Sequence, residues 1–361
     1  MNANPQQPEG LRLPGICASD RLFSAFLPVS TLVRELTVHP IEPGDDGAHA
    51  DVKELRDKIQ RSMSGAKARN VKEYRKYLKE FVLTGNGFAP PIILWHPECP
   101  SAVEEGQGHS LVIPSGLRFI PVDGETQLAA WHELAKGGEL DHLVNVSILL
   151  DCSEEMAIQH YHDINVYRVR PCRNQAVSRD RRSKATQVAH RLVDDIPFFQ
   201  EQVLFDAPTL PKNDTDHSLL FATLVDACFA SLEGESPFGK QVAVRGNVPE
   251  ATYEKIKAWW TQVTGSLGAS IQDGTSLVTG KPILLAAIGK LGSQAMATEQ
   301  DWEQEMRLKL EKLADIRWEF RYWDGICGDL DGEKFRVMRS RDAFDKVFKA
   351  LAEPESDLGQ K

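Results

Sequence analysis

The sequence predicts an α/β domain followed by a mainly α-helical domain. Apolar segments of strand length alternate with amphipathic helices up to about residue 170, and beyond Ala185 the 3.6-residue period of helices dominates. The 361 residues also exceed the usual length of one domain. We place the boundary near residue 200, around "DDIPFFQ", which gives an α/β domain over 1–200 and a helical domain over 201–361.

The first elements are read from apolar spacing. Residues 23–33, "FSAFLPVSTLV", predict a strand followed by a turn, and residues 44–51, "GDDGAHAD", predict a loop. Apolar residues then recur at helical spacing over 52–63 and over 71–81, which predicts two amphipathic helices. Proline residues enclose a short buried strand in "PPIILWHP", residues 90–97.

The next segment changes from strand to helix through a glycine. After "EEGQGHS", which predicts a polar loop, residues 119–134 read "FIPVDGETQLAAWHEL": an apolar strand, an Asp-Gly turn and a helix that Gly137-Gly138 would end. "LVNVSILLDC" predicts another strand. Ser153, followed by two glutamates, is a favourable N-cap for the helix after it.

The second half predicts helices joined by Gly- and Pro-containing connectors such as "EGESPFGK" and "GSLGASIQDGTS". The helical segments are "HSLLFATLVDACFASL", "EATYEKIKAWWTQVTGSL", "KPILLAAIGKLGSQAM" and "EQDWEQEMRLKLEKLADIRW". The tryptophans on these helices could stack on bases, but on amphipathic helices they are more often part of a core. We therefore expect them in the core or at an interface.

Composition excludes several classes of protein. The chain is 42% hydrophobic and 26% charged, with a net charge of −10, which is typical of a soluble globular protein. No apolar run approaches the ~18 residues of a membrane span, and the N-terminus lacks a signal-peptide pattern, so a cytoplasmic location is expected. No C-x-x-C pair is present, which predicts free thiols at Cys17, Cys99, Cys152, Cys172, Cys228 and Cys327. Walker A, Rossmann and G-x-S-x-G motifs are absent from the sequence.

The Asp-Gly turn at 123–127 is a candidate anion site. A strand that enters a helix through glycine leaves backbone N–H groups pointing one way, where the helix dipole also favours negative charge. Gly124 would permit close approach of a phosphate and Thr126 offers a hydroxyl, while Asp123 and Glu125 could hold a ribose hydroxyl or a hydrated divalent metal. A plain connection between strand and helix is the alternative.

A basic run lies within this acidic protein. The run from Arg168 to Arg191 contains one acid, Asp180. Its basic residues are Arg168, Arg170, Arg173, Arg179, Arg181, Arg182, Lys184 and Arg191. Such a cluster is the electrostatic footprint of nucleic-acid binding, although a solvated helix face has the same composition.

Three segments carry a family resemblance. "VDGETQLAAWHEL" resembles the DGQHR signature of the DGQHR-domain, DndB-like family of DNA-modification-associated proteins, and also the G-E-R-R-x-R-A box of the ParB/sulfiredoxin-like fold. "HYHDINVYRVRPCRNQ" is similar to a second family segment, in which Asp163, Ile164 and Asn165 are followed by Pro171. The Trp-rich end, "DWEQEMRLKLEKLADIRW", resembles the C-terminus of these proteins.

The likeness departs from the family at the first motif. Where the family has Gln-His-Arg, this chain has Glu125, Thr126 and Gln127, so an expected phosphate-binding arginine is missing. Gln127 can donate a hydrogen bond to a phosphate but cannot neutralise it. Nucleotide binding is therefore better supported than hydrolysis, with charge supplied by Arg168, Arg170 and Arg173.

The resemblance implies a nucleotide-binding, DNA-associated component of a bacterial DNA-modification system, of phosphorothioate or 7-deazapurine type. ATP or another nucleotide, with Mg²⁺, would be the cofactor, and DNA and a modification enzyme of the same locus would be the partners. ParB-like ATPase or nucleotidase activity and homo-oligomer formation stay open. Two alternatives also stay open: a DNA-binding transcriptional regulator of that locus, and a non-catalytic scaffold that docks a modification enzyme.

Site roles follow from the turn, the basic run and this resemblance together, with residues 123–127 and 165–173 forming one phosphate-facing cleft. The implied catalytic residues are Asp123 and Glu125, and the implied metal ligands are Asp123, Glu125 and Asp163. The implied nucleotide-binding residues are Gly124, Thr126, Gln127, Asn165, Arg168 and Arg170. The implied DNA-binding residues are Arg173, Arg179, Arg181, Arg182 and Lys184, of which Arg179 and Arg182 would share a helix face.

Overall fold

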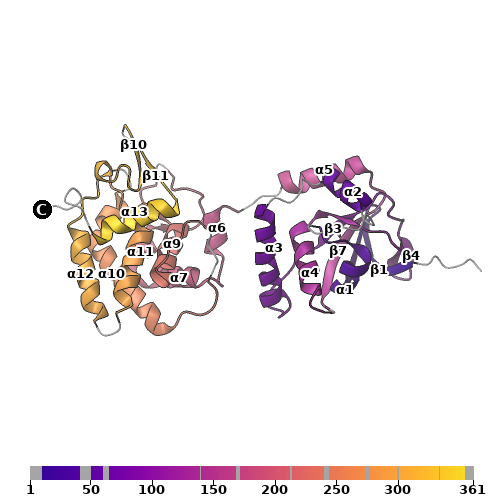
Figure 1. The fold of residues 1–361 in the computed structure, drawn as a ribbon, viewed down its shortest axis with the longest axis horizontal. Helices are drawn as coiled ribbons and strands as arrows, with labels where there is room; N and C mark the ends of the chain where they lie inside the picture. The colour runs from indigo at the N-terminus through magenta and orange to yellow at the C-terminus, as the bar shows by residue number, and fades with distance from the viewer. Residues whose placement is uncertain are drawn as a thin grey trace, which may run out of the picture. The chain divides into compact units, whose positions relative to one another are not determined.

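The computed structural model describes two compact units, Met1–Val169 and Arg170–Lys361 (Figure 1). The described residues are 10–40, 50–59, 65–138, 140–167, 171–211, 214–239, 244–273, 276–298, 301–332 and 334–353. The second unit begins earlier than the expected boundary near residue 200, because the helix over residues 184–195 packs into the core of the second unit.

A seven-stranded mixed sheet forms the centre of the N-terminal unit, in the order β4-β5-β1-β2-β7-β3-β6. The strands are β1 (Gly10–Ser19), β2 (Leu22–Pro28), β3 (Ile92–Trp95), β4 (Val103–Glu105), β5 (Gly108–Pro114), β6 (Ile120–Asp123) and β7 (Leu143–Leu149). Neighbouring strands are antiparallel except β3 and β7, which are parallel. Strands and helices are thus mixed as the sequence predicts.

Helices cover the two faces of this sheet unequally. On one face lie α1 (Val29–Thr31), α3 (Gly65–Tyr77), α4 (Glu125–Ala135) and the π-helices Leu32–Leu36 and Leu78–Val82, over a core that includes Phe23, Val146 and Trp131. On the other face, α2 (Ala50–Ile59) and α5 (Glu154–Val166) pack over β6 and its neighbours (Figure 1). Consequently α4 and α5 lie on opposite sides of the sheet.

The N-terminal unit differs from expectation in two places. Residues 104–110, expected as a loop, form part of the β4–β5 hairpin, whose turn contains Gly106 at a φ of 63°. The turn expected after β2 is helical over residues 29–36. Most of the loop expected at 44–51 lies outside the described residues, and α2 begins at Ala50. The hairpin pairs with β1, a non-local contact that local composition does not reveal.

The C-terminal unit is mainly helical, as predicted. Its helices are α6 (Arg173–Ser178), α7 (Lys184–Asp195), α8 (Pro197–Gln202), α9 (Phe221–Glu233), α10 (Glu250–Gln272), α11 (Pro282–Met296), α12 (Trp302–Ala314), α13 (Arg341–Ala352) and a 3₁₀ turn at Phe320–Tyr322. Two short strand pairs join them: β8 (Val203–Leu204) with β9 (Leu219–Leu220), and β10 (Gly328–Asp331) with β11 (Lys334–Val337). The connector expected from residue 265 is instead helical as far as Gln272.

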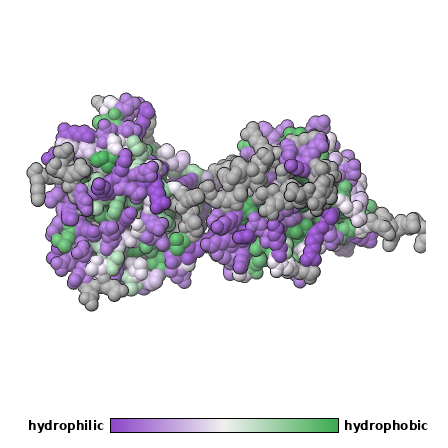
Figure 2. All heavy atoms as spheres, viewed as in Figure 1, coloured by the Kyte–Doolittle hydropathy of each residue, from purple (hydrophilic) through white to green (hydrophobic). Residues whose placement is uncertain are grey.

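Close packing of small residues holds the helical core together. Gly289 lies so near α9 that a Cβ would be 2.4 Å from the Ala227 carbonyl oxygen, and Gly292 lies against the Trp259 indole. The tryptophans at 259, 260, 318 and 323 are buried, which confirms the prediction that they belong to the core. On the face drawn in Figure 2, hydrophobic side chains are scattered among hydrophilic ones. None of the described helices is long and apolar enough to cross a membrane.

The cysteines are all free thiols, as predicted. Three of them, Cys152, Cys228 and Cys327, are buried, and the other three are half-buried. Burial raises the pKa of Cys99 and of Cys327 to about 12, so these thiols stay protonated at neutral pH.

Candidate functional site

The turn between β6 and α4 has the strand–glycine–helix geometry that the sequence predicts. Gly124 is the N-cap of α4, with φ 87° and ψ 17°, and its carbonyl accepts a hydrogen bond from the Leu128 N–H at 2.8 Å. Glycine supplies no side-chain acceptor for the first N–H groups of the helix. Asp123, Glu125 and Thr126 are half-buried beside it. This arrangement suits an anion at the start of α4.

Gln127 is hydrogen-bonded through its side chain to other segments of the unit. Its side chain is buried, its Oε1 accepts from the Tyr74 hydroxyl at 3.3 Å, and its Nε2 donates to the Pro90 carbonyl at 3.0 Å. Burial also raises the pKa of Tyr74 to about 12, which keeps that hydroxyl a donor. The Gln127 amide therefore links α3 to the segment before β3, and the structure uses both ends of the amide that was expected to contact phosphate.

Asp163 and Asn165 lie near the end of α5. Asp163 Oδ1 is 3.3 Å from His162 Nδ1 and accepts from Gln159 Nε2 at 2.6 Å, and these two contacts lower the pKa of Asp163. Asn165 Nδ2 donates to the Tyr161 carbonyl at 2.7 Å. All of these partners belong to α5, on the sheet face opposite α4.

The three predicted metal ligands do not lie together. Within the described ranges, no three His, Cys, Asp or Glu side chains gather as a metal site, so Asp123, Glu125 and Asp163 do not share one. The reason is their position, since the first two flank the start of α4 and Asp163 lies on a helix of the opposite layer. Arg168 and Arg170, which are predicted to bind nucleotide, lie outside the described residues.

Arg173 forms an ion pair inside the C-terminal unit. Its guanidinium holds the Asp226 carboxylate through two hydrogen bonds, Nη1 to Oδ2 at 3.0 Å and Nη2 to Oδ1 at 2.5 Å. Asp226 is 4% exposed on α9, where burial raises the pKa of its carboxyl against the opposing effect of Arg173. The guanidinium of Arg173, which is predicted to contact DNA, thus has a protein partner for its charge.

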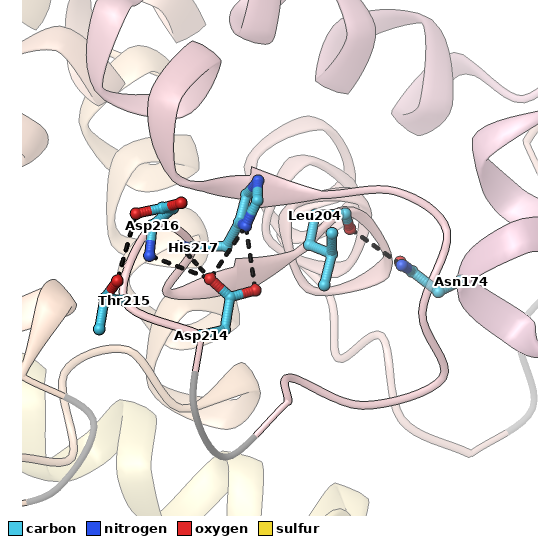
Figure 3. Close-up of polar contacts among 6 residues, drawn as sticks. All are labelled: Asn174, Leu204, Asp214, Thr215, Asp216 and His217. Carbon is cyan, nitrogen blue, oxygen red and sulfur yellow. Dashed lines mark hydrogen bonds and ion pairs between the residues drawn. The ribbon is translucent and has the colours of Figure 1, made fainter.

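Asn174, which is not among the predicted site residues, anchors this region (Figure 3). Its buried Nδ2 donates to the carbonyls of Leu204 and Phe205 at 2.9 Å and of Ala207 at 3.1 Å. Its Oδ1 accepts from the Ala222 N–H at 2.8 Å. One amide thus joins α6 to β8 and to the start of α9. A polar residue between Arg173 and Gln175 offers no local signal of such burial.

A second group of polar contacts, centred on Asp214, lies in the loop before β9 (Figure 3). Asp214 Oδ1 accepts from the N–H groups of Asp216 at 3.0 Å and His217 at 2.9 Å, and both of its oxygens lie near His217 Nδ1. The His217 N–H is the main cause that lowers the pKa of Asp214. The loop leads into β9, which pairs with β8, and Asn174 binds the Leu204 carbonyl of β8.

Four cations gather between α6 and α7, in a segment we call the basic loop, residues 179–184. Arg179, Arg181 and Arg182 are exposed, and Lys184, the first residue of α7, is half-buried. The prediction that Arg179 and Arg182 share a helix face is wrong, because residues 180–183 are not helical. The loop ends where Lys184 N–H donates to the Val244 carbonyl at 2.9 Å.

Backbone contacts hold the basic loop in place. Asp180 Oδ1 accepts from the Arg182 N–H at 2.8 Å, and Gln187 Nε2 donates to the Arg181 carbonyl at 3.1 Å. Arg191, at the end of the basic run, instead forms a two-point ion pair with Glu250 at 2.6 and 3.0 Å and lies 3.4 Å above the Tyr253 ring. The run therefore includes two arginines that pair with acids of the same unit, Arg173 and Arg191, and the basic loop.

The chain is thus a mixed-sheet unit followed by a helical unit that presents a fixed cluster of cations. A family model, DndB, described as DNA-sulfur modification-associated, matches residues 48–352. The chain belongs to the DndB family, which confirms the DndB-like resemblance. Of the two modification chemistries that the sequence left open, the family description names the sulfur one. Neither a curated protein nor a solved structure matches this chain.

Proposed function

We propose that this protein is a DNA-associated component of a DNA-sulfur modification system and that it contacts the DNA backbone through the basic loop. The observation that carries the proposal is the cluster of three exposed arginines and one lysine in a chain of net charge −10. Hydrogen bonds with neighbouring side chains fix the backbone of this cluster. Phosphate contacts of this kind supply affinity and position a protein on DNA without reading its sequence.

The start of α7 adds to the attraction. Lys184 is the first residue of this helix, and the N-cap, Ser183, makes no side-chain capping bond. The partial positive charge of a helix N-terminus therefore adds to the charges of the basic loop. Asp180, the acid within this segment, is turned onto the Arg182 N–H. Together these features favour an anion such as a backbone phosphate.

The same proposal includes a nucleotide at the turn before α4. Gly124 would admit a phosphate to the first N–H groups of α4, Thr126 would donate its hydroxyl, and Asp123 and Glu125 would hold the ribose or the water shell of Mg²⁺ and act in any hydrolysis. The supporting observation is the left-handed Gly124 between β6 and α4. The assignment of the N-terminal unit to the ParB/sulfiredoxin-like fold is part of this proposal. Calorimetry with ATP, with and without Mg²⁺, tests it.

The DNA arm is tested by a salt titration. Fluorescence anisotropy with a labelled duplex gives the slope of log affinity against log salt for the parent and for Arg179→Ala/Arg181→Ala/Arg182→Ala. Each lost phosphate contact should lower the magnitude of the slope by roughly 0.9, so the triple variant should lose up to about 2.7. All duplex sequences should weaken about equally.

The matched control removes three exposed arginines elsewhere in the same unit. Arg307→Ala/Arg321→Ala/Arg336→Ala changes the net charge by the same amount and should leave the slope within error of the parent. Equal losses in both variants would show a general charge effect and would refute the basic loop as the site. A parent that binds no DNA would favour the scaffold role, and binding confined to one promoter sequence would favour the regulator.

A further inference from the structure

Part of the central sheet carries apolar side chains that face solvent. Phe26 of β2 is 68% exposed, Ile16 of β1 is 66%, Val103 of β4 is 61% and Leu143 of β7 is 57%. A strand face turned to water usually carries polar residues. Four large apolar side chains on neighbouring strands are therefore unusual, since scattered single ones would need no explanation.

The pairing register places these side chains on one face. Phe26 pairs with Asn145, Leu143 pairs with Pro28, and Ile16 pairs with Ser24, and residues paired across strands point to the same side. On the outer strands, Val103 pairs with Ser110, which in turn pairs with Pro14 of β1. We call this surface the open sheet face.

Helices cover only the other end of this face. Leu22 and Leu149 pair with each other on the same side as Phe26, and both pack with Ala157 and Val52 under α5 and α2. The alternate residues Phe23, Ala25 and Leu27 are buried on the opposite side, under the main core of the unit. Exposure of the four apolar side chains shows that no described helix reaches across the open sheet face.

The polar groups on this face can each donate and accept. Ser24 Oγ lies 3.3 Å from Ser147 Oγ, between Ile16 and the neighbouring strand β7. Asn145 is the cross-strand neighbour of Phe26, and its Oδ1 is a buried acceptor with no hydrogen-bond donor among the described residues. At the rim, Arg12 Nη1 and Glu105 Oε1 form an ion pair at 3.1 Å, so their charges offset each other.

We propose that the open sheet face packs against the same face of a second copy of this chain. Hydroxyl and amide groups are self-complementary across a two-fold axis, because each is both donor and acceptor. Two chains of net charge −10 repel one another, and an uncharged apolar face is where they can approach. Edge-to-edge pairing through β4 is disfavoured, because this strand is three residues long and places Glu104 and Glu105 against a second copy of the same charges.

The size of the face sets the strength of the dimer. Its exposed apolar side chains lie on β4, β1, β2 and β7, whereas β5 contributes Ser110, which is buried, so the set spans at most about 19 Å at the ~4.8 Å spacing of strands. Along the strands it covers about 13 Å, as from Leu143 to Ser147. A face of a few hundred Å² is smaller than the ~800 Å² per partner of a standard interface, so the dimer should be reversible, with a dissociation constant in the micromolar range.

Sedimentation equilibrium of the full chain tests this proposal. From about 1 to 100 µM, at moderate salt and without DNA or nucleotide, the parent should pass from monomer to dimer. Ile16→Thr/Phe26→Thr keeps strand propensity and should weaken the dimer at least about tenfold. Leu143→Lys should do the same, because it would bury a charge in the apolar contact. Phe26→Leu should retain most of the dimer.

The matched control places the same changes on another exposed apolar residue. Leu308, 45% exposed on α12, becomes Thr or Lys and should leave the dissociation constant unchanged. Circular dichroism at a concentration where the parent is monomeric should show unchanged unfolding midpoints for all variants, since none of the substituted side chains is buried. A parent that stays monomeric at the highest concentration overturns the proposal. So does a folded Ile16→Thr/Phe26→Thr or Leu143→Lys variant that dimerises as the parent does.

Discussion

Removal of Arg173 should destabilise the C-terminal unit by an amount that depends on pH. In Arg173→Ala, the buried Asp226 loses the guanidinium that holds both of its oxygens. A buried carboxylate without a partner takes up a proton, because burial already raises its pKa. The neutral carboxyl can remain in the core, whereas the charged one cannot.

The cost is bounded by the free energy of protonation. With an ordinary carboxyl pKa of 3.8, protonation at pH 7 spans about 3.2 pH units at ~1.36 kcal/mol each, or about 4 kcal/mol. At pH 5 the same bound falls to between about 1 and 2 kcal/mol. The sign follows from linkage: the folded variant keeps a proton that the unfolded chain releases above pH 3.8, so its stability falls as pH rises.

Removal of Asp226 should cost less. The Arg173 side chain is half-exposed, so in Asp226→Asn its guanidinium can turn to water, and a loss of about 1 kcal/mol is expected. Urea unfolding followed by tryptophan fluorescence measures both variants, because five of the seven tryptophans lie in this unit. Equal costs for the two variants, or a cost of Arg173→Ala that does not change between pH 7 and pH 5, would refute the reasoning. Arg179→Ala, an exposed neighbour, is the control.

Three further predictions concern the N-terminal unit, each measured by urea unfolding. Gly124→Ala should lose about 1–2 kcal/mol because its φ of 87° strains any side chain, while Gly124→Asn should lose less, and equal losses would contradict this cause. Gln127→Arg should destabilise the unit by about 3 kcal/mol or more, because it buries a cation where the Gln127 amide bridges two segments. A stable variant with higher nucleotide affinity would contradict this structural role of Gln127. Burial, followed by the nearby His39 and Lys136, lowers the pKa of His132 to about 3. The stability that neutral His132 provides should therefore be complete above pH 6.5 and fall by ~1.4 kcal/mol per pH unit below pH 6.5. His132→Gln should flatten this pH dependence, and an unchanged slope would assign the dependence to another group.

Local patterns in the sequence were enough to predict the helices and the turn. Amphipathic spacing placed the helices around residues 52–59 and 71–77 and four of the C-terminal helices, α9 to α12, because 3.6-residue periodicity is a property of neighbouring residues. The Asp-Gly pair placed the change from β6 to α4, since a left-handed residue there favours glycine. Ser153 was identified as an N-cap, and its Oγ accepts from the Met156 N–H.

Contacts between distant segments decided the rest. Strand β1 and the hairpin at 103–114 are sheet partners whose pairing depends on residues about a hundred positions apart. Gln127 and Arg173 carried the expected chemistry in their side chains, yet each is bound by a residue 53 positions away, Tyr74 and Asp226. A buried polar group must find a partner inside the fold, and only the tertiary arrangement settles whether that partner is the protein itself or a ligand.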